Sequence, residues 1–239
     1  MNRGLPGKIF SDMRNDIIMG ACPIGGRLPT ERELAQKYKA SRFAIREAIA
    51  MLAQSGFVVT HPQSGTYVKD FNQEGSVETL VQVLRVRKTI DRKTLESLLK
   101  FRYVTETEAA GEAALRVSQG DIESLEANLA RKREHLRDVA VLAECDYDFH
   151  SAIITLSGDI ISRLVFQSFK PVYSFFSEFY YAIAEAPEAS LELNLKLVRA
   201  LKRRDPAASR KAMGHVLKFA EKKVYEALKG GNSTMIRFS

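Results

Sequence analysis

The placement of glycine and proline divides this chain into two differently built parts. Both residues recur through the first seventy positions, whereas long stretches after Gly75 are nearly free of them. Because glycine and proline interrupt regular elements, we expect short elements joined by turns in the first part and long helices in the second. The shift predicts a first domain over residues 1–70, a linker over 71–76, a second domain over 77–230 and a tail over 231–239.

Positive charge is concentrated in the first part. The 239 residues carry a formal net charge of +7, and residues 1–70, with ten Lys/Arg and six Asp/Glu, contribute +4 of it. An excess of this kind favours an acidic partner. The two cysteines are too few for a disulfide framework and match no zinc motif, which indicates a reducing compartment. No run of about 18 apolar residues occurs, so we expect no membrane span and a cytoplasmic location.

Capping residues define the helices of the first domain. Thr30 is an N-cap candidate with Glu33 at the capping-box distance, and Ser41 is placed to cap the next helix. Alternating apolar residues around a Pro/Gly-containing turn then indicate a hairpin. The predicted elements are helices ending at Gly20, between Thr30 and Ala40, and over 42–54, followed by strands over 57–60 and 66–68.

Two short helices joined by a tight turn and followed by a hairpin form a winged helix-turn-helix. The second helix of such a pair enters the DNA major groove with its N-terminal residues at the base edges. Arg42 and Arg46 lie one turn apart on the polar face of that helix and can bond guanine, while Ser41 and the helix N-terminus suit phosphate. The alternative interpretation is a solvated face shared with Glu47.

The same residues resemble the winged-helix domain of the GntR family of bacterial transcription regulators. The matching residues are Gly25-Gly26-Arg27-Leu28-Pro29-Thr30-Glu31-Arg32-Glu33-Leu34-Ala35, Ser41-Arg42-Phe43-Ala44-Ile45-Arg46-Glu47-Ala48-Ile49, Leu52, Gly56 and Ser64-Gly65-Thr66-Tyr67-Val68. The resemblance implies DNA contacts from the helices by Arg32, Ser41, Arg42, Phe43 and Arg46, and from a wing tip formed by Gln63, Ser64, Gly65 and Thr66. The wing departs from the family at His61-Pro62, where relatives often carry an arginine.

The second part reads as helix after helix. Asp121 and Pro206 are typical helix starts, and Gly158 is a typical helix end. The predicted helices cover residues 77–84, 94–115, 121–137, 139–156, 160–184, 189–203 and 206–228. The expected fold class is therefore mainly α: an N-terminal winged helix-turn-helix followed by an all-α effector-binding bundle of about seven helices.

This helical part resembles the effector domain of the FCD branch of the GntR family, typified by its fatty-acid-responsive regulator. The residues that carry the resemblance are Arg102 with Glu106, Asp146-Tyr147-Asp148-Phe149-His150, Leu156-Ser157-Gly158-Asp159, Asp205-Pro206-Ala207-Ala208 and Ala212-Met213. Many members of this branch hold a divalent metal with an aspartate and three histidines, and the metal then holds a small carboxylate effector.

The chain keeps only half of that ligand set. Asp146 and His150 are spaced to share one helix face and are weak metal candidates. Asn194 and Val216 stand where relatives carry the other histidines. His215 is one residue early, and such a shift turns a helical side chain by about 100°. No metal cofactor is therefore assigned, although a metal-held carboxylate stays as the alternative effector. His150 can also be a buried histidine bonded to Asp146 or Tyr147.

Aromatic residues offer a second kind of effector site. Residues 166–181 carry eight of the 21 Phe and Tyr, and a stripe of them is either plain core or a surface for a long apolar ligand. The fatty-acid-responsive regulators, which the chain resembles further, bind long-chain acyl-coenzyme A and lack the full metal set. The resemblance thus implies an acyl-coenzyme A effector. The candidate effector-binding residues are Arg102, Asp146, His150, Phe169, Tyr173, Phe176, Tyr180, Asn194 and His215.

No enzyme motif is present. The chain has no phosphate-binding glycine loop, no nucleophile elbow and no HExxH-type helix. Asp146, Asp148 and His150 leave a metal-dependent hydrolase as a remote alternative, and a DNA-coating protein that senses nothing is another. The preferred hypothesis is a ligand-responsive transcription regulator that binds a palindromic operator in double-stranded DNA as a homodimer and responds to a small-molecule effector, either acyl-coenzyme A or a small carboxylate.

Overall fold

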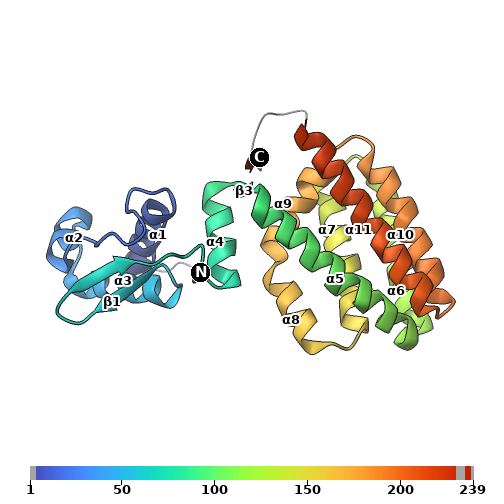
Figure 1. Cartoon of the computed structure of the whole chain (residues 1–239), viewed down its shortest axis with the longest axis horizontal. Coiled ribbons are helices and arrows are strands. Elements are labelled where there is room, and N and C mark those ends of the chain that lie inside the picture. Colours follow the sequence, from blue (N-terminus) through green and yellow to red (C-terminus); the bar gives the residue numbers. More distant parts are fainter. Residues whose placement is uncertain (1–3, 230–234, 238–239) are drawn as a thin grey trace. The chain divides into compact units, whose positions relative to one another are not determined.

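A computed structural model describes residues 4–229 and 235–237. These residues form eleven α-helices and four short strands (Figure 1), so the prediction of a mainly helical chain is confirmed. The chain divides into two compact units, Met1–Lys88 and Thr89–Ser239. Within the described residues, no helix combines the length and the apolar character needed to cross a membrane.

The first unit is built on a winged helix-turn-helix, as predicted. Its elements are α1 (Gly4–Ile18), α2 (Glu31–Tyr38), α3 (Arg42–Gln54), β1 (Val58–His61) and β2 (Gly65–Val68). Thr30 caps α2 through a complete capping box, and Ser41 caps α3 by accepting from the backbone N–H of Ala44. The two strands pair antiparallel from Val58 opposite Val68 to His61 opposite Gly65. The caps fix where each helix begins, and the hairpin forms the wing.

The helix α4 (Val77–Arg87) belongs to the first unit, although the composition assigned it to the second domain. Val83 is buried in the core of the first unit. The Thr79 hydroxyl donates to the Ser55 carbonyl at 3.0 Å, and the Arg87 guanidinium donates to the Ile18 carbonyl. These contacts carry the first unit past the expected linker at 71–76 and place its end at Lys88.

The second unit is a helical bundle. Its helices are α5 (Arg92–Arg116), α6 (Gln119–Glu134), α7 (Val139–Leu156), α8 (Ile160–Ser168), α9 (Lys170–Tyr181), α10 (Ala186–Lys202) and α11 (Pro206–Lys229). The long helices α5 and α11 pack side by side, and α10 packs against α11 (Figure 1). On the other side of α5, the helix α7 packs against α5, α6 and α9. The helices α5, α6, α7, α9 and α10 therefore enclose one interior.

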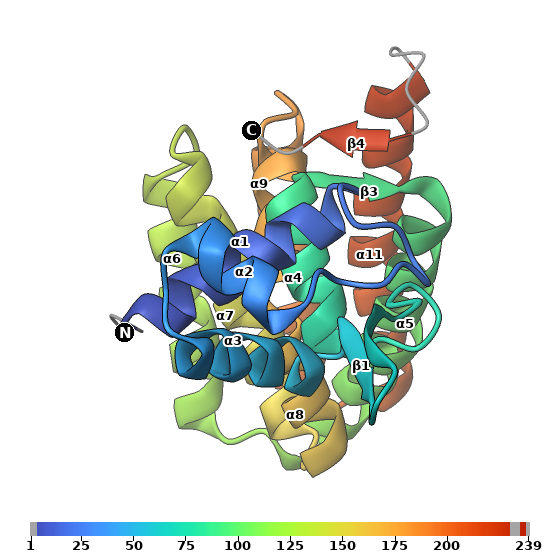
Figure 2. The same cartoon turned by 90° about the vertical axis from the view of Figure 1, so that its left-hand side faces the viewer.

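A small antiparallel ribbon, which the sequence did not predict, accompanies the bundle. The strand β3 (Thr89–Asp91) pairs with β4 (Met235–Arg237), with Ile90 opposite Ile236 (Figure 2). Part of the predicted tail therefore forms a strand. Elements of three residues are too short to show the alternation by which a strand is recognised in a sequence.

The predicted helix over 160–184 is two helices, α8 and α9. They meet at Phe169, and Pro171 lies in the first turn of α9. Proline has no N–H to donate, and its ring clashes with the carbonyl of residue i−4, here Gln167. An uninterrupted helix through this point is therefore unfavourable. The break gives α9 its own direction, and its tyrosines lie against α7.

Candidate DNA interface and buried polar site

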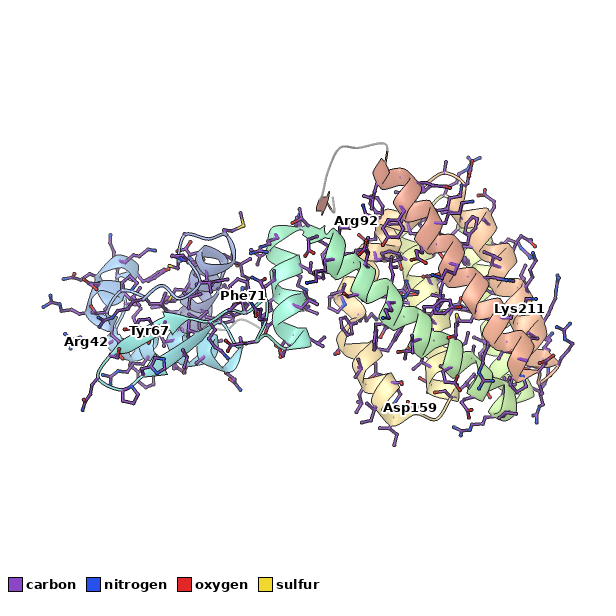
Figure 3. All side chains as sticks on the ribbon, in the orientation of Figure 1. Arg42, Tyr67, Phe71, Arg92, Asp159 and Lys211 are labelled. Carbon is purple, nitrogen blue, oxygen red and sulfur yellow. The ribbon has the colours of Figure 1, made fainter. Side chains whose placement is uncertain are left out.

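The start of α3 presents its polar side chains to solvent. Ser41, Arg42, Phe43 and Arg46 are exposed, and Phe43 is 72% exposed despite being apolar. The opposite face of the helix, including Ile45, is buried in the core of the unit. The apolar stripe of α3 therefore fixes the direction in which the two guanidinium groups project. Figure 3 shows Arg42 at the surface of the first unit.

The helix α2 supports this surface. Arg32 is exposed near its start. The Glu31 carboxylate accepts from the Arg46 guanidinium at 2.7 Å in an exposed ion pair, so it orients Arg46 from the neighbouring helix. The Glu33 carboxylate accepts from the Thr30 backbone N–H and hydroxyl, which holds its pKa below the usual value. Both acidic residues of this turn are thus occupied, one in orienting an arginine and one in capping.

The wing tip is a tight three-residue turn. Gln63 adopts a left-handed conformation, with φ of 64°. Hydrogen bonds link the Ser64 hydroxyl to Tyr67 at 2.9 Å and the Thr60 hydroxyl to Thr66 at 3.0 Å. Gln63 and Ser64 are exposed, whereas Gly65 and Thr66 are half-buried. The four predicted wing residues therefore sit together at the end of the hairpin.

Arg27 is a functional candidate that the sequence reasoning missed. It pairs with Tyr67 through an isolated bridge beside the wing. Gly65 has φ of 131°, and a Cβ added to it would lie 2.6 Å from the Arg27 Nε. The guanidinium thus lies directly on the bare α-carbon of Gly65, at a position that only glycine leaves open. The signal available in the sequence was the position of Arg27 directly after Gly25 and Gly26 in the family motif, but no role was assigned to Arg27 there.

Inside the second unit, five helices bring polar side chains together in the core. All of these side chains are buried. The cluster, called the buried polar site below, consists of Arg102 and Glu106 on α5, Lys132 on α6, Asp146 and His150 on α7, Tyr173, Ser177 and Tyr181 on α9, and Ser190 and Asn194 on α10. Five of the nine predicted effector residues are thus gathered there, namely Arg102, Asp146, His150, Tyr173 and Asn194.

Asp146 is the most heavily bonded member. Its Oδ2 accepts from Tyr173 at 2.8 Å and from Ser177 at 3.2 Å. Its Oδ1 accepts from Tyr181 at 2.5 Å and from the Lys132 ammonium at 3.5 Å. Burial alone would raise the pKa of the Asp146 carboxyl, but the charge of Lys132 and of the neighbouring cations outweighs burial and lowers that pKa. Asp146 is therefore an ionised carboxylate with four donors on its two oxygens.

A second chain of polar contacts runs beside it. The Arg102 guanidinium donates to Glu106 at 2.7 Å and to the Tyr173 hydroxyl at 2.9 Å, and it lies 4.3 Å from the centre of the Tyr173 ring. The Nδ1 of His150 contacts the other Glu106 oxygen. Burial acts to raise the pKa of the Glu106 carboxyl, but the charge of Arg102 and the contact with His150 act more strongly and hold that pKa below its usual value. His150 is thus a buried histidine whose hydrogen-bond partner is Glu106. Its Nε2 lies 3.9 Å from the Asp146 Oδ1, which is too far for a hydrogen bond.

The sequence reasoning missed Lys132, Ser177, Tyr181 and Ser190, of which Lys132 is the charged member. Its side chain has no exposed surface, and its ammonium donates to Tyr181 at 2.7 Å and to Ser190 at 2.9 Å as well as to Asp146. Burial lowers the pKa of Lys132, and the Asp146 carboxylate offsets part of that effect. In the sequence it stands in a basic run that resembles a solvated face. The usable signal was its helical phase, since Leu125, Leu129 and Lys132 fall on one stripe.

Asn194 and the predicted effector residues outside the buried polar site fall in different environments. Asn194 is fully buried, and within the described residues neither atom of its amide has a hydrogen-bond partner. Phe176 and Tyr180 are buried core residues, and Phe169 is half-buried where α8 meets α9. His215 is exposed on α11, whereas the next residue, Val216, is buried. The shift of one residue therefore turns His215 away from the interior.

The donor set does not fit a divalent metal. Metal sites of this kind are built from imidazole and carboxylate groups whose lone pairs are free. Here the two Asp146 oxygens already accept four hydrogen bonds, one of them from the Lys132 ammonium. Across residues 4–229, no three or more His, Cys, Asp or Glu side chains are placed to share an ion.

Two hollows lie near the helices of the second unit. A groove of about 430 Å³ runs between α6 and α7 and is lined by Asp121, Asn128, Asp148 and Thr155 among others. A crevice of about 10 Å³ opens beside Arg102 between α5 and α11. The small crevice is lined by Arg102, a member of the buried polar site, while the groove lies on the other face of α7.

A winged helix with exposed arginines at the start of its second helix, joined to a helical bundle with a polar interior, defines a two-part transcription regulator. Comparison with family models agrees: residues 6–68 match the bacterial regulatory proteins of the gntR family, and residues 97–219 match the FCD domain. The chain belongs to the GntR family and carries an FCD domain.

Characterised relatives are transcription regulators as well. The HTH-type transcriptional regulator Mce2R of Mycobacterium tuberculosis is 28% identical over 171 residues, which cover 72% of this chain and 71% of that protein. The fatty acid metabolism regulator protein of Shewanella amazonensis is 27% identical over 190 residues, covering 76% and 74%. The structure of Lar from Listeria monocytogenes has a TM-score of 0.65 at 18% identity, covering 94% and 98%, and supports the fold alone. The chain is a transcription regulator, not an enzyme.

Proposed function

We propose that this protein binds a palindromic operator as a homodimer in the cytoplasm, and that a small molecule bound by the second unit changes its affinity for DNA. The observation that carries the DNA-binding part is the start of α3, where two arginines and a phenylalanine project from a helix whose other face is buried. A winged helix-turn-helix places this part of the helix against the base edges. Two copies of the helix, about 34 Å apart, match two half-sites of an operator.

Each exposed side chain of α3 suits a different part of DNA. Arg42 and Arg46 can each bond the O6 and N7 of a guanine, and Phe43 can contact a thymine methyl group. Ser41 and the free N–H groups at the start of α3 suit a phosphate oxygen, and Arg32 on α2 suits a second phosphate. The ion pair between Arg46 and Glu31 is exposed, so breaking it on the DNA costs little.

The wing adds a second contact surface. Gln63, Ser64, Gly65 and Thr66 are proposed to meet the minor groove. Where relatives often carry a wing arginine, this chain has His61-Pro62, but the Arg27 guanidinium lies against Gly65. We therefore propose that Arg27 supplies the positive charge of the wing from outside the hairpin. A guanidinium placed there suits the negative potential of a narrow minor groove.

The proposed effector is a fatty acyl-coenzyme A. It is supported by the relative from Shewanella amazonensis, whose name refers to fatty acid metabolism, and by the aromatic residues Tyr173, Phe176 and Tyr180 around the interior. Because these side chains are packed, an acyl chain has to displace them, and the short helix α9 is the element that would move. The alternative, a small carboxylate held by a divalent metal, is disfavoured by the donor set of the buried polar site.

Binding to DNA fragments tests both parts of the proposal. Fragments are selected from the genome by the protein itself, and affinity is measured by fluorescence anisotropy at fixed salt. Arg42→Ala and Arg46→Ala should each weaken specific binding by about 5–150-fold, as the loss of one bidentate arginine–guanine contact requires. The control is Lys211→Ala, because Lys211 is exposed on α11 of the second unit, and this change should leave DNA binding unchanged.

The effector is tested on the same fragments. Oleoyl-coenzyme A should change the affinity of the wild-type protein for its operator, whereas coenzyme A alone should not. If binding responds to salt but to no acyl thioester, the proposed effector is wrong. If Arg42→Ala and Arg46→Ala leave the preference for the selected fragments intact, the assignment of α3 as the recognition helix is wrong. If the wild-type protein shows no preference among DNA fragments, it coats DNA without reading its sequence.

A further inference from the structure

The most unusual group in the second unit is the ammonium of Lys132. Burying an isolated ammonium costs several kcal/mol, so such a group persists only where every N–H is bonded and its charge is matched. Lys132 meets both conditions. Its three N–H donors have three acceptors, namely Asp146, Tyr181 and Ser190, which come from three different helices.

The two carboxylates of the buried polar site are matched by two cations without any added ion. Arg102 and Lys132 are its cations, and Glu106 and Asp146 are its anions. Arg102 pairs with the Glu106 carboxylate, and Lys132 pairs with the Asp146 carboxylate. A divalent ion would therefore add two positive charges with no carboxylate left to match them, and it would have to displace the ammonium from Asp146.

We infer that the Lys132 ammonium is the permanent cation of this site, standing where a divalent ion would otherwise neutralise Asp146, so that the effector domain is built to work without metal. Lys132 links α6 to the Asp146 carboxylate of α7 and to Ser190 of α10. The domain thus obtains the cross-link from its own chain. This inference deepens the proposed function, because it concerns the same effector site.

Asn194 supports this assignment independently. It is fully buried with both amide atoms unpaired, and it lies one helical turn from Ser190 on the same face of α10. The Asn194 amide has no imidazole nitrogen, which is the donor that metal-binding relatives carry at this position. The site keeps Asp146 and His150, but the Asn194 amide on α10 is unbonded. The cation that neutralises the Asp146 carboxylate is therefore the Lys132 ammonium.

The experiment is to rebuild the metal site with and without the lysine. Three full-length proteins are compared: wild type, Asn194→His with Val216→His, and the same pair with Lys132→Ala. Each is freed of metal with EDTA and titrated with Zn²⁺ and Mn²⁺ by calorimetry, and bound metal is counted after dialysis. We expect metal binding that depends on Asp146 only in the third protein, with a gain from substoichiometric to one ion per chain. Asp146→Asn in that background should remove it.

The outcomes separate cleanly. Wild-type protein that takes up stoichiometric metal and loses it on Asp146→Asn overturns the inference, and so does a histidine pair that binds metal equally well with Lys132 present. A third protein that is folded by circular dichroism yet binds no metal also counts against it. If that variant does not fold, the wild-type titration decides alone. None of these measurements uses DNA, so they stand apart from a failure of the proposed operator binding.

Discussion

The pairing of Lys132 with Asp146 predicts a strong and specific effect on stability. Lys132→Met keeps most of the length of the side chain but removes its charge, which leaves the Asp146 carboxylate buried with three neutral donors. At the 3.5 Å separation of Nζ and Oδ1, the attraction between unit charges is about 5 kcal/mol at an effective dielectric constant of ~20. Removing one partner of a buried ion pair typically costs about 3–5 kcal/mol. We expect a loss of that size.

Thermal unfolding of the full-length protein, followed by circular dichroism, measures the loss. For a domain of this size, each kcal/mol shifts the midpoint by about 2–4 °C, so Lys132→Met should lower it by ~6–20 °C. The matched control is the neighbouring residue. Arg131 pairs with Glu144 at 2.6 Å, but both side chains are about half exposed, so Arg131→Met should cost no more than ~1 kcal/mol.

A double-mutant cycle tests whether the loss comes from the charge of Asp146. Asp146→Asn removes the buried anion, so the double variant with Lys132→Met should recover a large part of the lost stability. Contacting residues in one network commonly show coupling energies of about 0.5–3 kcal/mol, and we expect the upper end here. Additive losses would show that the two groups are not an ion pair. A midpoint of Lys132→Met within ~2 °C of the wild type would refute the argument from burial.

Three further outcomes follow from other parts of the molecule. Arg27→Ala should weaken operator binding while leaving the folded state intact by circular dichroism, and an unchanged affinity would remove Arg27 from the wing surface. Gly65→Ala should both destabilise the first unit and weaken binding, because its φ of 131° is strained for alanine and its Cβ meets Arg27; a neutral result in both assays would contradict the geometry. Thermal midpoints should also fall on acidification. In the folded protein, the pKa values of Asp146 and Glu106 lie below their usual values of 3.8 and 4.5. The stability that these carboxylates give is therefore present above about pH 4.5 and is lost as the pH falls further. Asp146→Asn should make the decrease in thermal midpoint with falling pH shallower, and a steeper decrease would contradict the assignment.

Much of the first unit could be predicted because its signals are local. Thr30 and Ser41 cap their helices through bonds to residues three positions on, and such bonds depend on nothing distant. The assignment of α4 failed for the opposite reason. Its place is set by contacts such as that of Thr79 with Ser55, twenty-four residues earlier, which no local pattern contains.

The buried polar site was only partly predictable. Asp146 and His150 share a helix turn, so their common direction can be read from their spacing. Lys132 was hidden because basic residues flank it on both sides, and its partners Tyr181 and Ser190 come from helices 49 and 58 residues away. The split between α8 and α9 had a local sign in Pro171, which the long aromatic run obscured.

The ribbon of β3 and β4 connects the two ends of the described part of the second unit. Asp91 is both the last residue of β3 and the N-cap of α5, where its carboxylate accepts from the Thr94 N–H. The backbone pairing of Asp91 with Met235 therefore fastens the C-terminal strand to the first turn of the helix that carries Arg102 and Glu106. Tension applied to the C-terminal strand would pass straight to the beginning of that helix.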